Sequence, residues 1–148
     1  MKLTRIILFL VLYIGAATLH ATAADTNQVQ AILIAASNES GRTDSRLSRY
    51  EPTLKRILRF ESYRFRGQGA TSLAPGKSGH ISLGDGQSLE LTAENSGNRG
   101  VRIRVVWDKN GRTLMKTGLT LRPGIPAVLG GPSTGKRGEV YAVILTAQ

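Results

Sequence analysis

The chain has 148 residues, a length that suits one domain with a sizeable hydrophobic core. It contains 20 basic residues, 10 acidic residues and no cysteine, which excludes a disulfide framework, a thiolate nucleophile and a thiolate metal site. The excess of positive charge favours partners that carry negative charge.

The first 23 residues have the three-part layout of a secretory signal peptide. Two cations precede an apolar run over residues 6–17, and small residues follow just before Ala24. The run is shorter than the ~20 residues that a helix needs to span a bilayer. We therefore predict that residues 1–23 are a signal peptide, that residues 24–148 form a single β-rich domain, and that no transmembrane span remains after cleavage.

The predicted cleavage changes the net charge of the protein and indicates where it is located. It removes Lys2 and Arg5, so that 18 basic residues face 10 acidic ones and the formal charge becomes +8. Small secreted domains of animals commonly rely on disulfides, so the absence of cysteine favours a bacterial envelope. We expect an exported protein, either periplasmic or extracellular.

The first two predicted elements are a buried strand and an interrupted helix. Residues 29–36 are almost continuously apolar, which predicts a strand inside a sheet. Asp44 is a good N-cap, and apolar residues follow it at helical steps: Leu47, Tyr50, Leu54, Ile57 and Leu58. An amphipathic helix is expected at about residues 44–58. Pro52 interrupts it, because proline lacks an amide donor, so we expect either a kink or two short helices, the second with Pro52 in its first turn.

From Phe60 onward the apolar pattern has a period of two, which predicts strands and no further helix. The predicted strands cover residues 60–67, 70–74, 80–83, 88–93, 101–108, 112–121, 127–129 and 139–147. The last of these is apolar on both faces, which is typical of a strand at the middle of a core.

Asn110-Gly111 is the strongest local signal, because a type I′ hairpin turn needs positive φ at both of its central positions. In the strand that precedes this turn, Trp107 shares the alternating apolar face, so we expect it in the core. Together these patterns predict a mainly β (α+β) fold: an antiparallel β-sandwich or partly open barrel, with one short, proline-interrupted helix near the N-terminus.

Residues 130–137 nearly match the phosphate-binding pattern G-x-x-x-x-G-K-[ST]. Arg137 replaces the final hydroxyl residue, which binds magnesium, and the motif must also open a helix. Because residues 139–147 predict a strand instead, we expect a glycine-rich hairpin loop with Lys136 and Arg137 in solvent. The glycines would supply unusual backbone angles. No cofactor is predicted.

Catalytic and metal-binding signals are weak. His80 is the only histidine after the predicted signal peptide, and Ser78 and Asp85 are the nearest candidates for a triad. Serine and aspartate are common in turns, and groups so close in one hairpin rarely converge with triad geometry. One histidine without cysteine also disfavours a transition-metal site. We predict that the protein is not an enzyme, and a small hydrolase that uses His80 is the second alternative.

The strongest functional signal is a cluster of eight cations: Arg42, Arg46, Arg49, Lys55, Arg56, Arg59, Arg64 and Arg66. Four of them fall at helical steps beside the apolar stripe, and with a nearby tyrosine they are the candidate binding residues: Arg42, Arg46, Arg49, Arg56 and Tyr63. The sequence favours a non-enzymatic domain that contacts a cell-envelope component through this basic helix face. The alternative is a binding module for an anionic glycan or lipid, and no nucleic acid partner is expected. An ordinary solvated helix face would show the same pattern.

Residues 120–131 read T-L-R-P-G-I-P-A-V-L-G-G. They resemble the strand, turn and V-L-G-G hairpin of the outer-membrane secretin channels of bacterial secretion systems and pili. In that family the hairpin sits in a much longer, multidomain chain, so no family residue is carried over as a site. The resemblance implies an accessory role in secretion or in the cell envelope.

Overall fold

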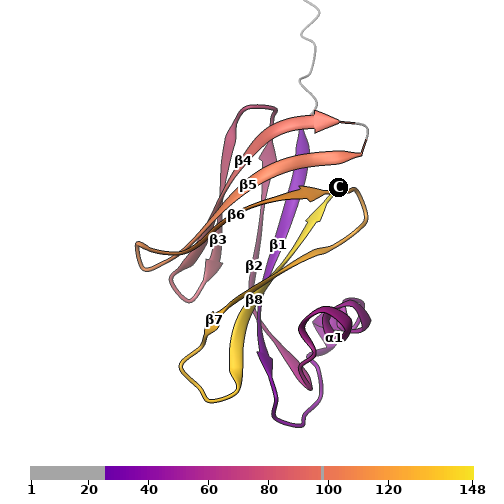
Figure 1. The fold of residues 1–148 in the computed structure, drawn as a ribbon, viewed down its shortest axis with the longest axis vertical. Helices are drawn as coiled ribbons and strands as arrows, with labels where there is room; N and C mark the ends of the chain where they lie inside the picture. Colours follow the sequence, from indigo (N-terminus) through magenta and orange to yellow (C-terminus); the bar gives the residue numbers. More distant parts are fainter. Residues whose placement is uncertain (1–25, 98) are drawn as a thin grey trace, which may run out of the picture.

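The structure, a computed structural model, describes residues 26–97 and 99–148, so the predicted signal peptide lies outside the described residues. Within this part, eight strands form two four-stranded antiparallel sheets that pack as a β-sandwich (Figure 1). Sheet A has the order β2-β1-β8-β7 and contains β1 (Asn27–Ser37), β2 (Ser62–Leu73), β7 (Ala127–Ser133) and β8 (Glu139–Ala147). Sheet B has the order β3-β4-β5-β6 and contains β3 (Ser78–Gly84), β4 (Gln87–Gly97), β5 (Gly100–Lys109) and β6 (Arg112–Leu121). The predicted mainly β class and antiparallel sandwich are confirmed.

The helical segment consists of two short helices, which is the second of the two outcomes predicted from Pro52; it is not one kinked helix. The 3-10 helix η1 (Ser45–Leu47) begins after Asp44, whose Oδ1 accepts a hydrogen bond of 3.1 Å from the backbone N–H of Arg46. The α-helix α1 (Glu51–Leu58) follows with Pro52 in its first turn, where no helical hydrogen bond is lost. Neither helix in the described part of the chain is long and apolar enough to cross a membrane.

Sheet A is covered on both of its faces. The helices lie on the side of the sheet away from sheet B (Figure 1), over a second core. This second core contains Ile32, Ile34, Ala36, Leu47, Tyr50, Leu54, Tyr63, Ala142 and Ile144. Strands β1 and β8 pair with each other and occupy the middle of the sheet. Their nearly continuous apolar sequences are therefore explained by burial on both faces, as predicted.

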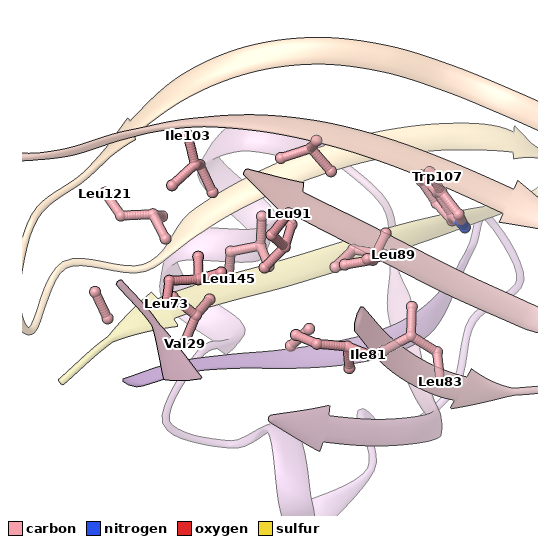
Figure 2. Packing of buried hydrophobic residues seen from close by; sticks show 14 of the residues in the cluster. Val29, Leu73, Ile81, Leu83, Leu89, Leu91, Ile103, Trp107, Leu121 and Leu145 are labelled. Carbon is pink, nitrogen blue, oxygen red and sulfur yellow. The ribbon is translucent and has the colours of Figure 1, made fainter. Parts of the chain in front are cut away.

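The main core fills the space between the two sheets. Figure 2 shows side chains from both sheets pointing into it: Val29, Leu73 and Leu145 come from sheet A, and the other labelled residues come from sheet B. The labelled residues are Val29, Leu73, Ile81, Leu83, Leu89, Leu91, Ile103, Trp107, Leu121 and Leu145. The hairpin of β5 and β6 turns through Asn110 and Gly111, with φ of 50° and 77°, which confirms the positive φ expected at both positions.

One prediction about the strands was wrong: residues 60–67 and 70–74 form the single strand β2. Gly67, at the end of the first predicted strand, and Gly69, in the interval, permit a close approach to the edge of sheet B instead of making a turn. A Cβ at Gly69 would lie 2.6 Å from Cγ2 of Ile81 and 2.8 Å from the carbonyl oxygen of Ser82. Glycine in a strand interior commonly marks such an approach of another backbone. The edge strands β2 of sheet A and β3 of sheet B therefore pack closely against each other.

Trp107 is fully buried, as predicted, and its ring leaves room only for glycine at position 131 in the opposite sheet. Its indole N–H donates a hydrogen bond of 2.9 Å to Oε1 of Gln87, which is also buried. The ring lies against Gly131 of β7, where an added Cβ would overlap the six-membered ring and come within 3.0 Å of the carbonyl oxygen of Tyr141. Gly131 has no positive φ, so packing against the indole requires it and backbone conformation does not.

We expect Gly131→Ala to lower the free energy of unfolding by about 1–3 kcal/mol, because the added methyl group forces the indole or β7 to shift. Urea denaturation followed by tryptophan fluorescence measures the change. Gly130→Ala is the matched control, because a Cβ there would lie 3.6 Å from Cδ2 of Leu58, an ordinary contact. Equal stability of the two variants would contradict the proposed role of Gly131.

Candidate functional site

The structure places four of the five candidate binding residues on the surface. Arg42 lies in the connection after β1, Arg46 in η1, Arg49 just before α1, and Arg56 within α1, and all four are exposed. The packing of Leu47, Tyr50 and Leu54 against sheet A fixes the position of the helices. The arginines are therefore presented on the outer side of a rigidly attached segment.

Tyr63 does not belong to this surface. Its side chain is fully buried, and its hydroxyl oxygen accepts a hydrogen bond of 3.2 Å from the backbone N–H of Phe60. Burial raises the pKa of the Tyr63 hydroxyl. The physical reason is its register in β2, where Tyr63 pairs with Ala36 and faces the second core. The prediction that Tyr63 contacts a ligand at the surface is therefore corrected: it is a core residue.

Arg46 is largely occupied by contacts within the protein. Its Nη2 lies 2.6 Å from Oδ2 of Asp44, and its Nε donates to Oδ1 of the same carboxylate at 3.0 Å. Its guanidinium carbon also lies 4.0 Å from the centre of the Phe65 ring. The side-chain hydrogen bond from Arg46 lowers the pKa of Asp44 to about 2. Asp44 therefore stays ionised at neutral and mildly acidic pH and offsets the charge of Arg46.

Arg49 and Arg56 differ from Arg46, because neither forms an ion pair with any residue that the structure describes. The guanidinium carbon of Arg49 lies 5.1 Å from the centre of the Tyr50 ring, which restricts its position and leaves its donors free of carboxylates. Elsewhere in the cluster, Lys55 lies 2.9 Å from Glu51 and its hydrogen bond lowers the pKa of that carboxyl. Arg49 and Arg56 are thus available to an external anion.

A pocket of about 260 Å³ lies beside Arg49, at one end of the outer face of sheet A. Three parts of the chain form it: the junction of η1 with the first turn of α1, the paired ends of β1 and β8, and the connection between β6 and β7. Figure 1 shows that this connection passes the C-terminal end of β8. The lining residues are Gln30, Arg49, Tyr50, Thr53, Gly124, Pro126, Thr146, Ala147 and Gln148.

The pocket exists because the apolar cover of sheet A ends at Gln30 and Thr146. These two residues pair with each other across β1 and β8, on the same face as the buried Ile32 and Ile144. The helices cover the isoleucines and leave the polar pair half-buried. The sequence signal for this site was a polar residue two positions from a buried isoleucine on the same face of each strand: Gln30 before Ile32 in β1, and Thr146 after Ile144 in β8. It was missed, because residues 139–147 were read as apolar on both faces.

The opposite wall of the pocket is the connection between β6 and β7, which backbone hydrogen bonds hold in place. The N–H of Gly124 donates to the carbonyl oxygen of Ala147 at 3.3 Å, and the N–H of Ile125 donates to that of Arg122 at 3.1 Å. Gly124 has a φ of 75°, a conformation that favours glycine. The wall is therefore attached directly to the end of β8.

The residues considered for hydrolysis do not assemble into a triad. His80 is exposed on the outer face of sheet B. The Ser78 hydroxyl is hydrogen-bonded to that of Thr92 at 2.8 Å, and Asp85 accepts a hydrogen bond of 3.2 Å from Nε of Arg66. Among the described residues, no hydrogen bond joins His80 to either of them, and no group of three histidine or acidic side chains is placed to hold a metal ion.

The glycine-rich loop connects neighbouring antiparallel strands, as predicted, because β7 pairs with β8 from Ala127 opposite Leu145 onward. A strand follows the loop, so the helix that a phosphate-binding loop must open is replaced by β8. Lys136 and Arg137 are exposed. Gly135 and Gly138 have the expected positive φ, of 97° and 70°.

We expect Lys136→Ala to leave the free energy of unfolding within about 0.5 kcal/mol of the parent value, because the side chain is exposed and makes no ion pair with the described residues. Thermal denaturation checks this expectation. Calorimetric titration of the parent protein with magnesium ATP should give no saturable heat. Micromolar binding that is lost in Lys136→Ala would show instead that the loop is a nucleotide site.

Comparison of the chain with protein-family models, with curated proteins and with solved structures finds no match in any of the three. The resemblance of residues 120–131 to the secretin hairpin therefore stays a prediction. A fold alone does not determine a function, so the evidence for function lies in the chemistry of the cationic surface and its pocket.

Proposed function

We propose that this chain is a non-enzymatic, exported β-domain that contacts a negatively charged component of the cell envelope. The contact is made through the cationic face, which we define as Arg42 in the connection after β1, Arg49 just before α1, and Arg56 within α1. The observation that carries the proposal is the state of two guanidinium groups. Arg49 and Arg56 are exposed and have no ion pair among the described residues, whereas Arg46 and Lys55 are paired.

Free, exposed arginines suit a phosphate or carboxylate partner. A guanidinium group presents its N–H donors in a planar fork that matches these anions in a bidentate manner. The helices that carry the arginines are packed on sheet A by Leu47 and Leu54, so little ordering is needed on binding. The formal charge of +8 predicted for residues 24–148 adds a long-range attraction to anionic surfaces.

The envelope as the place of action is supported by two features of the sequence. Residues 1–23 have the layout of an export signal, and residues 120–131 resemble the hairpin of an outer-membrane secretin. Anionic glycans and anionic lipids both present the required groups in an envelope. An accessory role in secretion or in envelope organisation would follow from such a contact.

Salt-dependent retention on an immobilised polyanion, such as heparin, tests the proposal. We expect the double variant Arg49→Gln/Arg56→Gln to elute at a clearly lower salt concentration than the parent, because screening weakens the few exposed contacts that remain. The matched control is Lys136→Gln/Arg137→Gln, which removes the same charge from the exposed β7–β8 loop. The control should elute close to the parent.

The comparison of the two double variants separates the cationic face from overall charge. If both variants shift by the same amount, net charge alone governs retention and the proposal is wrong. Fluorescence of the buried Trp107 shows whether each variant retains its fold.

A further inference from the structure

The pocket beside Arg49 has one charged side chain in its lining. Gln30, Thr53 and Thr146 are neutral, and no side chain in the lining is acidic. A single arginine matches a ligand group with a single negative charge, such as a phosphodiester or a carboxylate. A phosphomonoester would bring a second charge without a partner, which is costly in a partly desolvated site.

The neutral polar residues of the pocket suit a hydroxylated ligand. Gln30 and Gln148 supply amide donors and acceptors, and Thr53 and Thr146 supply hydroxyl groups. Neither the Thr53 hydroxyl nor the Thr146 hydroxyl forms a hydrogen bond with another described side chain. The volume of about 260 Å³ lies just below the ~300–1,000 Å³ of sites for drug-sized molecules, so the ligand group is small.

Two exposed apolar residues, Ile57 and Ile125, are near lining residues of the pocket, one along α1 and one along the β6–β7 connection. Ile57 and Ile125 are the large hydrophobic residues that are strongly exposed in the described part of the chain, with exposed fractions of 48% and 56%. Ile125 lies between two lining residues of the β6–β7 connection. Ile57 follows Thr53 by one helical turn, so the two residues share a side of α1. Ile57 was expected within the buried stripe and lies at its exposed border instead.

From this arrangement we infer that the pocket binds the phosphodiester headgroup of an anionic phospholipid at a membrane surface. Arg49 binds the phosphodiester, and Gln30, Thr53 and Thr146 bind hydroxyl groups of the headgroup. Ile57 and Ile125 enter the interface between headgroups and acyl chains, where apolar side chains are favoured. The inference rests on the proposed function and narrows its partner to lipid.

Co-sedimentation with vesicles tests the inference on the whole exported protein. The parent protein should bind vesicles of phosphatidylcholine and phosphatidylglycerol in equal parts, and should not bind vesicles of phosphatidylcholine alone. Thr53→Val/Thr146→Val keeps charge and shape and removes both hydroxyl groups. We expect about tenfold weaker vesicle binding from the loss of two hydrogen bonds. The matched control is Thr113→Val/Thr120→Val on β6, at two exposed threonines outside the pocket, which should bind like the parent.

A second pair of measurements separates the headgroup from the membrane. Ile57→Ser/Ile125→Ser should weaken binding to the mixed vesicles and leave the affinity for soluble glycerophosphoglycerol, measured by calorimetry, unchanged. Glucuronate supplies a hydroxylated carboxylate of similar size. It should bind more weakly than glycerophosphoglycerol.

Three results would overturn the inference. The first is vesicle binding that Thr53→Val/Thr146→Val leaves unchanged, which would assign lipid contact to the cationic face without the pocket. The second is tighter binding of glucuronate, which would make the pocket a site for acidic sugars. The third is binding of soluble glycerophosphoglycerol without any binding to vesicles. Each of these leaves the proposed function intact, because that function fails only if the polyanion retention of the arginine variant equals that of its charge-matched control.

Discussion

The burial of sheet A on both faces is the constraint on which the rest of this structure depends. Its central strands, β1 and β8, carry apolar side chains toward sheet B and also toward the opposite side. A single sandwich covers only one of those faces, so a second layer is needed to remove the other from water. The helical segment supplies that layer through Leu47, Tyr50 and Leu54. The position of the arginines is thus a consequence of where hydrophobic surface had to be covered.

The same constraint explains why a polar pocket lies beside the cationic face. Two short helices cover only part of the outer face of sheet A, and the strands become polar where the cover stops, at Gln30 and Thr146. The β6–β7 connection has to pass from one sheet to the other at this end of the sandwich. A shallow space remains between the helices and that connection. Arg49, just before α1, lies at its border.

Much of the fold could be predicted because its signals are local. The period of two, the Asn110-Gly111 turn, the capping residue Asp44 and the placement of Pro52 each depend on a few neighbouring residues. The features that were missed depend on residues far apart in the chain. Position 131 requires glycine because the indole of Trp107 from the other sheet packs against it. Tyr63 is buried because the helices cover it. No local pattern encodes either relation.

The candidate site was predictable only in outline for the same reason. The basic cluster is visible in the sequence, but which cations are free is decided by contacts that sequence spacing does not distinguish. Arg46 and Arg49 are three residues apart on the same segment, yet one is held by Asp44 and Phe65 and the other lines the pocket. The pocket itself joins residues from positions 30, 53, 124 and 146, and no motif could have connected them.

The close approach of β2 to β3 also bears on whether the domain stays monodisperse at high concentration. Exposed sheet edges recruit strands of other molecules and start aggregation. The glycine contacts cover the edges formed by β2 and β3. Of the two edges that remain, β7 contains Pro132, which has no amide donor, and β6 carries Arg112 and Lys116, whose charges repel a second copy of the same strand. A domain without disulfides thereby combines long β-strands with protection against edge-to-edge association.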